Sequence, residues 1–161
     1  MRVLAVPLAA SLAVVLAGRA PSAILVTPDA RTAMHEMWKG SLESRREAVA
    51  CLASVIEEDT VRITRIMPLD GLGIDSLAVG AKTSLETCSP PVWQGTVHTH
   101  IALYDGRRPY STFSGADRGV MLDWGQRWNT QGTFCLLFGE TMIHCELDGP
   151  AGALIFPSTT Y

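Results

Sequence analysis

The stretch of residues 47–56, with the sequence EAVACLASVI, is apolar at almost every position after its opening glutamate. A run without alternation is typical of a strand that is buried on both faces of a sheet. The acidic residues 57–59 predict a turn, and the alternating residues 61–66 predict a half-exposed antiparallel partner. The chain is therefore expected to fold around a sheet. Glu47 is either a solvated strand-end residue or a carboxylate that is desolvated for a reason.

The size and composition of the chain predict one packed domain. It has 161 residues, of which 47% are hydrophobic and 18% are charged. A chain of this length buries roughly two-thirds of its unfolded surface, and a disordered chain would be poorer in apolar residues. The net charge of −3 argues against nucleic acid as a partner, because nucleic-acid binding requires a basic surface.

Residues 1–23 differ in character from the rest of the chain. Arg2 precedes an apolar run at 3–17, which small residues follow. The run is shorter than the about 20 residues that cross a bilayer, and it is typical of a signal peptide. An uncleaved membrane anchor and a buried helix are the alternatives. We expect residues 1–23 to be a signal peptide or N-terminal hydrophobic segment, residues 24–161 to form the domain, and the protein to be exported (periplasmic or secreted).

The chain has four cysteines, Cys51, Cys88, Cys135 and Cys145. An oxidising compartment would allow them to pair in three possible ways. Cys135 and Cys145 flank a predicted hairpin, so a cross-strand disulfide between them is conceivable. Free buried thiols are the alternative. The sequence has no C-x-x-C spacing, so a zinc knuckle is not expected.

Two stretches have the apolar spacing of amphipathic helices. The first is expected to begin with a side-chain cap at Thr27 or Asp29 and to end at Gly40. The second begins at Ser114, whose hydroxyl would cap the helix, with Asp117 as the acidic residue of the first turn. Its apolar side is formed by Val120, Met121, Trp124 and Trp128.

The stretch VWQGTVHTH predicts a strand that carries His98 and His100 near its end. Side chains two residues apart in a strand share a face, so the two imidazoles could meet at one metal ion. The alternative is a polar patch on a half-buried strand, because two ligands do not make a metal site. The Gly-, Pro- and Ser-rich residues 68–91 predict a long loop with one helical turn, and loops of this length are often functional.

Three features occur in a fixed order along the chain: Glu47, then H-T-H at 98–100, then S-x-x-D at 114–117. This order resembles the motif of the JAB/MPN/JAMM zinc metalloproteases. The strands EAVACLA, VRITRIMPL and VWQGTVHTH also resemble strands of that family, so the resemblance covers roughly residues 24–147. It implies an α/β fold of the JAB/MPN (cytidine-deaminase-like) type, with a central mixed, mostly antiparallel sheet flanked by helices.

The resemblance also implies a role for each residue of the motif. His98, His100 and Asp117 would bind Zn²⁺, since catalytic zinc takes three protein ligands and keeps an open position for a water of lowered pKa. Glu47 would be the general base, and Ser114 would donate a hydrogen bond to the oxyanion.

The predicted function is that of a zinc-dependent metallopeptidase or isopeptidase that acts on a peptide or protein substrate. One alternative is a catalytically silent scaffold or binding module of the same fold. Another is a zinc amidohydrolase that acts on a small molecule or a cell-wall peptide. The N-terminus is expected to provide transient targeting to a membrane, with an uncleaved membrane anchor as the alternative.

The connection between His100 and Ser114 departs from the family pattern. Thirteen residues, 101–113, intervene where the family has a shorter connection, and Ile101 stands where the family commonly has proline. A longer surface loop costs little, because closure entropy grows slowly with loop length. We interpret the loop as a lip on the active-site groove, on which Arg107 and Arg108 either contact substrate or are solvated.

Two further residues near the motif are considered. His144 is a possible alternative ligand, but nothing in its spacing supports that role, and we expect a strand histidine that is bonded to backbone. Arg118 would either orient its neighbour Asp117 or be solvated.

Overall fold

The computed structural model describes residues 20–69, 83–103, 107 and 109–161. The predictions for the leader (residues 1–19) and for most of the long loop (70–82) fall outside the described residues. A helical turn at 83–87 belongs to the part of that loop that is described. In chain order the elements are β1 (Ala23–Val26), α1 (Pro28–Ser44), β2 (Val49–Glu57), β3 (Thr60–Pro68), β4 (Gly95–Thr99), α3 (Gly115–Trp128), β5 (Gly132–Leu137), β6 (Met142–Asp148), β7 (Leu154–Ile155) and β8 (Thr159–Thr160).

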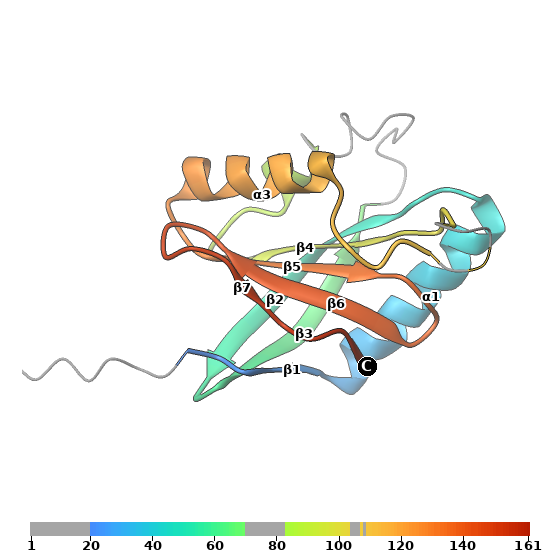
Figure 1. Cartoon of the computed structure of the whole chain (residues 1–161), viewed down its shortest axis with the longest axis horizontal. Helices are drawn as coiled ribbons and strands as arrows, with labels where there is room; N and C mark the ends of the chain where they lie inside the picture. Colours follow the sequence, from blue (N-terminus) through green and yellow to red (C-terminus); the bar gives the residue numbers. More distant parts are fainter. Residues whose placement is uncertain (1–19, 70–82, 104–106, 108) are drawn as a thin grey trace, which may run out of the picture.

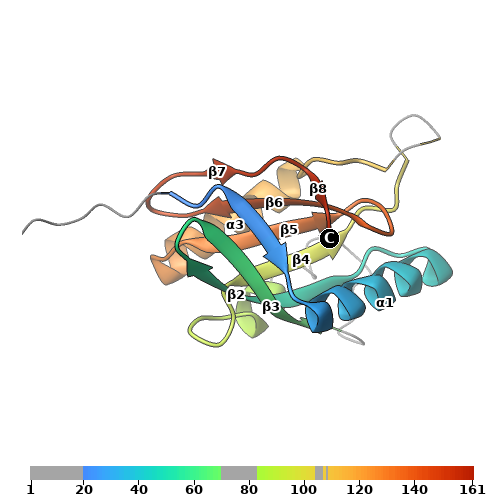
Figure 2. The same cartoon turned by 90° about the horizontal axis from the view of Figure 1, so that it is seen from below.

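The strands form one mixed sheet in the order β1-β3-β2-β4-β5-β6-β7, and β8 also pairs with β6. Pairing is parallel between β1 and β3 and between β4 and β5, and antiparallel elsewhere among these strands. The two long helices lie on opposite faces of the sheet (Figure 1). Figure 2 shows β1 beside β3, with which it pairs as the first strand in the order of the sheet. The predicted α/β architecture, with a mostly antiparallel sheet between helices, is confirmed.

Each face of the sheet has its own apolar core. The core under α1 includes Met34, Trp38, Val97, Cys135 and Leu137. The core under α3 includes Cys51, Met121, Trp124, Phe134 and Leu136. Because side chains alternate along a strand, Val97 of β4 points to α1, whereas His98 and His100 point to the side of α3.

The predicted hairpin of residues 47–66 is present as β2 and β3, and Glu58 makes the turn between them with a φ of 55°. The expectation of burial on both faces holds for the first part of β2, where Ala50, Cys51 and Leu52 are fully buried. It is wrong for the end of the strand, where Val55 and Ile56 are exposed. A run of apolar residues without alternation indicates a buried strand, but it does not show where along the strand the burial ends.

Helix α1 begins near the expected residue and continues past the expected end. Thr27 is the N-cap residue, but its side chain donates to the carbonyl of Thr64 at 3.1 Å rather than capping the helix. Gly40 lies inside the helix, which ends at Ser44 before the left-handed residue Arg45. The helix continues because the next residue, Ser41, is buried against the sheet, and this tertiary contact outweighs the low helix propensity of glycine.

All four cysteines are paired in two disulfides. Cys135 and Cys145 join β5 to β6 directly across the hairpin, so the disulfide considered from the sequence is confirmed. Cys51 and Cys88 join β2 to the segment that precedes β4. Among the residues that the structure describes, no helix is both long enough and apolar enough to span a membrane.

Candidate metal centre

The two histidines lie at the end of β4. His98 pairs with Val49 of β2 and with Leu136 of β5. His100 follows the last strand residue, but its N–H donates to the carbonyl of Leu137 at 2.8 Å, so the backbone stays in the sheet register. The pleat therefore places both imidazoles on the same face, as the sequence predicts.

Asp117 reaches the histidines from the first turn of α3. The Nε2 atoms of His98 and His100 lie 3.2 Å apart. Asp117 places Oδ1 at 3.4 Å from Nε2 of His98 and Oδ2 at 3.4 Å from Nε2 of His100. The potential ligand atoms of these three residues all lie within 4.8 Å of one another.

These separations fit a tetrahedral ion. Zinc–nitrogen and zinc–oxygen bonds of about 2.0–2.1 Å at tetrahedral angles place neighbouring ligand atoms about 3.3–3.4 Å apart. The observed distance of 3.2 Å between the two nitrogens is close to this value. Each nitrogen also lies 3.4 Å from one oxygen of the carboxylate, His98 from Oδ1 and His100 from Oδ2. Two imidazoles and one carboxylate are also a donor set that catalytic zinc uses. The three residues could therefore hold a divalent metal ion.

A backbone contact orients His100 for such a role. Its Nδ1 lies 3.2 Å from the carbonyl oxygen of Tyr110, which can only accept a hydrogen bond. The neutral ring therefore carries its proton on Nδ1 and presents the lone pair of Nε2 to the candidate ion. A histidine that ligates a metal commonly makes this second contact, because it fixes the tautomer and the ring orientation.

Ser114 and Asp117 form the capping box that the sequence predicts. The N–H of Asp117 donates to Oγ of Ser114 at 3.2 Å, and the N–H of Ser114 donates to Oδ2 of Asp117 at 2.6 Å. The box holds the carboxylate at the helix N-terminus, facing the histidines. The hydroxyl of Ser114 accepts within the box, so its own hydrogen remains available for donation. Helix capping and metal ligation are thus compatible roles for Asp117.

The charges of the cluster reinforce one another. Burial by itself would raise the pKa of Asp117, but hydrogen bonds with His100 and His98 outweigh it and lower the pKa well below the ordinary carboxyl range. Burial by itself would lower the pKa of His100, but the hydrogen bond with Asp117 and the negative charge of Glu47 raise it overall. The site is therefore a negative environment that favours a cation.

Glu47 lies on the same face as the histidines. Val49 pairs with His98, and the N–H of Thr99 donates to the carbonyl of Ala48 at 3.0 Å, so Glu47 follows in register opposite His100. Its charge acts on His100. The residue precedes β2 and is half-buried rather than the first residue of a buried strand. That exposure leaves its carboxylate in reach of water.

Thr99, between the two histidines, points to the opposite face and is fully buried. Its hydroxyl lies 2.8 Å from Oγ of Ser41 in α1 and accepts from the N–H of Ala48 at 2.8 Å. These bonds fix the end of β4 against α1 and against the residue that follows Glu47. This role of Thr99 was not predicted from the sequence.

His144 and Arg118 belong to a second polar cluster, around Glu146. His144 bonds to the side chains of Ser158 and Glu146, not to backbone, and it is not part of the group that could hold a metal. Arg118 is not simply solvated, because it makes two bonds to Glu146, and its charge also acts on Asp117. Glu146 was not predicted from the sequence. The alternation of β6 could have indicated it, since residues 144 and 146 share a face.

The loop between the histidines and α3 is described in part. Leu103 and Pro109 form an isolated antiparallel bridge at its base, and Arg107 is exposed. Arg108 and the turn at 104–106 lie outside the described residues. The interpretation of this loop as a lip on a groove stays a prediction.

No protein-family model matches the sequence, and no curated protein matches it. Among solved structures, the chain is similar to protein DSY2949 from Desulfitobacterium hafniense, whose structure was determined in solution. The similarity has a TM-score of 0.48 at 14% sequence identity and covers 82% of this chain and 88% of that one. A similarity of this degree carries no inference about activity.

Proposed function

We propose that this protein is a zinc-dependent hydrolase of peptide or isopeptide bonds, with the JAB/MPN-type fold that its motif resembles. The observation that carries the proposal is the convergence of His98, His100 and Asp117, whose potential ligand atoms lie close enough together to hold one metal ion. Glu47 and Ser114 on the same side of the sheet add the two other groups that amide hydrolysis requires.

Each residue has a defined task in this proposal. His98, His100 and Asp117 hold the ion, which when bound acts as a Lewis acid and lowers the pKa of water in its open position. Glu47 takes a proton from the attacking water as the water oxygen adds to the carbonyl carbon. Glu47 then delivers that proton to the nitrogen as the carbon–nitrogen bond breaks. Ser114 donates its hydroxyl hydrogen to the carbonyl oxygen while that atom carries negative charge.

The residues around the ligand set favour an enzyme over a silent scaffold. A scaffold needs neither a base at position 47 nor a donor at position 114, whereas both residues are present beside the ligands. The two disulfides support an exported protein, because disulfides persist in oxidising compartments. An exported hydrolase would act on extracellular or periplasmic peptides. A zinc amidohydrolase acting on small amides would use the same residues.

The test uses the purified full-length chain. We expect about one zinc per chain, and hydrolysis of a fluorogenic peptide library that a chelator abolishes and added Zn²⁺ restores. Glu47→Gln should keep the zinc and lose activity by about 10²–10⁴-fold, because the carboxamide cannot accept the proton. Glu43→Gln, an exposed change on α1, is the matched control and should retain activity.

Absence of bound zinc would contradict the proposal. So would hydrolysis by Glu47→Gln at the rate of the wild type. Turnover of small amides without turnover of any peptide would instead support the amidohydrolase.

A further inference from the structure

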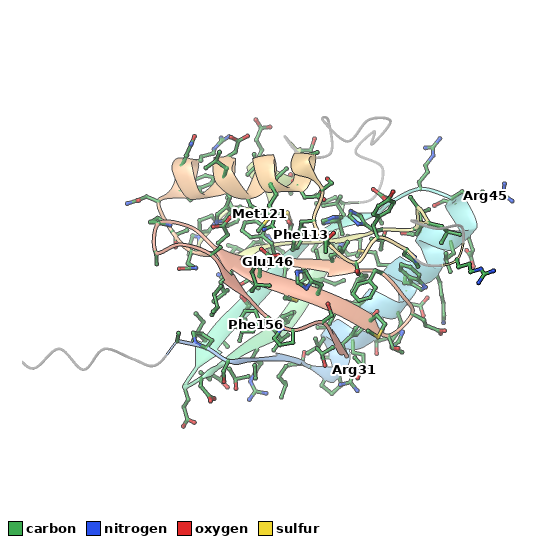
Figure 3. All side chains as sticks on the ribbon, in the orientation of Figure 1. Arg31, Arg45, Phe113, Met121, Glu146 and Phe156 are labelled. Carbon is green, nitrogen blue, oxygen red and sulfur yellow. A yellow bond between two sulfur atoms is a disulfide. The ribbon has the colours of Figure 1, made fainter. Side chains whose placement is uncertain are left out.

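Glu146 is a buried charge that the proposed hydrolysis does not use. Its side chain is 1% exposed, on the face of the sheet that α3 covers. Arg118 donates to both of its carboxylate oxygens, at 2.7 Å for the bond from Nη2. His144 lies at 3.0 Å from Oε1 through Nε2, and its Nδ1 lies 3.2 Å from Oγ of Ser158. In Figure 3, Met121, Phe113 and Glu146 are seen between α3 and β6.

The charge of Glu146 is fully compensated by these partners. Burial by itself would raise the pKa of Glu146, but the hydrogen bonds from Arg118 and then His144 outweigh it and lower the pKa. The order Ser158–His144–Glu146 is that of a nucleophile, a base and an acid. We nevertheless assign the group a structural task, because Arg118 occupies both carboxylate oxygens and neutralises the charge that would support the histidine.

This network lies directly beside the candidate metal centre. The ring of Phe113 has its centroid 5.7 Å from that of His98 and 5.6 Å from that of His144. The guanidinium of Arg118 lies 5.2 Å from the same ring. Phe113 is the residue before the N-cap of α3. The segment that leads into the helix therefore packs between His98 of the metal centre and His144 of the second cluster.

The ligand set depends on the placement of α3. His98 and His100 come from one strand and keep their spacing through the pleat, whereas Asp117 comes from the helix. Arg118, the next residue, bonds to β6, and Leu136 of β5 pairs with both His144 of β6 and His98 of β4. The Arg118–Glu146 pair therefore connects the first turn of α3 to the same part of the sheet that carries the histidines.

We propose that the Arg118–Glu146 pair, supported by His144, positions Asp117 for metal binding; this rests on the metal site of the proposed function. A buried ion pair adds little net stability compared with apolar residues of similar volume. The pair instead orients the first turn of α3, because a bidentate arginine–carboxylate contact fixes both the position and the angle of the two groups. Outer partners of this kind commonly tune metal affinity. Arg118 and Glu146 are positioning residues and do not contact the ion.

The test measures metal binding by the full chain, with Zn²⁺ and Co²⁺ alone as probes. Zn²⁺ affinity is determined by competition with a chromophoric chelator, and the Co²⁺ absorption spectrum reports coordination geometry. Arg118→Met should weaken Zn²⁺ binding by about 10–100-fold and alter the Co²⁺ spectrum. Arg118→Lys, which keeps the charge but not the fork, should give an intermediate loss. Arg127→Met removes the same charge from the exposed last turn of α3 and should leave both probes unchanged.

A paired replacement separates positioning from stability. Arg118→Met combined with Glu146→Leu removes both charges, so the melting temperature of the metal-free chain should recover relative to Arg118→Met alone. Zn²⁺ affinity should stay low, because the directional contact is still missing. Wild-type affinity and spectrum in the folded paired variant, or in Arg118→Lys, would overturn the positioning role alone. A wild-type chain that binds neither ion would overturn the proposed function together with it.

Discussion

Two clusters on the α3 side of the sheet are built from the same kinds of residue and differ in how their charge is balanced. In the first, His98 and His100 share Asp117, and their Nε2 atoms lie 3.2 Å apart. In the second, Glu146 receives two bonds from Arg118 and one from His144. Asp117 and Arg118, which are consecutive residues of α3, thus belong to different clusters.

The difference lies in the source of the cation. The second cluster includes its own cation, because Arg118 donates to both carboxylate oxygens of Glu146. The first cluster brings two nitrogens together that cannot both donate to each other, beside a carboxylate of lowered pKa. In the proposed function, a metal ion bound between these groups would supply the cation of the first cluster.

The largest expected effect distinguishes the clusters by metal content. His98→Ala and His100→Ala should each reduce bound zinc from about one per chain to nearly none, because two remaining ligands do not retain it. His144→Ala, the matched change in the second cluster, should keep most of the zinc, because all three ligands remain. The measurement is metal analysis after gel filtration. Loss of zinc from His144→Ala to the same extent would remove the distinction.

A second prediction concerns the two serines of the clusters. Ser114→Ala should lower the rate of hydrolysis by about 10²–10³-fold, because it removes a donor to the developing oxyanion. It should also destabilise the fold by about 1 kcal/mol through loss of the helix cap. Ser114→Thr keeps a hydroxyl and should recover part of both losses. Ser158→Ala should have the smaller effect on hydrolysis. Equal effects of the two alanine changes in rate measurements would speak against an oxyanion donor at 114.

A third prediction addresses the residue between the metal-site histidines. Thr99→Val should lower the free energy of unfolding by about 1–3 kcal/mol, because it leaves the N–H of Ala48 and the hydroxyl of Ser41 without their buried partner. Urea unfolding of the metal-free chain measures this loss. The combination with Ser41→Ala should be less than additive. Unchanged stability in Thr99→Val would show that the end of β4 is held by other contacts.

The smallest expected effect is on the pH dependence of stability. The pKa of Glu146 is lowered in the fold, so the stability that it contributes is present above the ordinary carboxyl value of 4.5 and is lost as the pH falls below it. Glu146→Gln should therefore flatten the acid limb of the unfolding free energy measured against pH. The exposed Glu43→Gln should leave that limb unchanged. Parallel acid limbs in wild type and Glu146→Gln would contradict the burial and pairing of this carboxylate.

Much of the candidate site could be predicted from local pattern. The H-T-H triplet on a strand specifies that two imidazoles share a face, because the pleat has a period of two. The S-x-x-D pattern specifies a capping box, because both bonds form within one helical turn. Both features depend on residues at most three positions apart, so short-range geometry determines them.

Other features depended on contacts that the local pattern does not contain. Glu146 was missed because its charged partner, Arg118, comes from α3, which is remote in sequence. The local pattern predicts that α1 ends at Gly40, whereas the helix continues. The bond between Ser41 and Thr99 spans fifty-eight positions of the chain, so the local pattern does not contain it. The role of Arg118 could not be chosen from its neighbour Asp117, because the two side chains of adjacent helical residues point in different directions.

The sequence by itself determined the sheet hairpin, the face that the two histidines share and the capped helix that carries Asp117. Hydrophobic spacing and short-range hydrogen bonds are sufficient for these. Only the tertiary structure decided that the helix lies where its carboxylate meets the imidazoles, and that Arg118 pairs with a buried glutamate beside them. The distance between a helix and a strand is set by the packing of the layers between them, and that packing sums contacts from the whole chain.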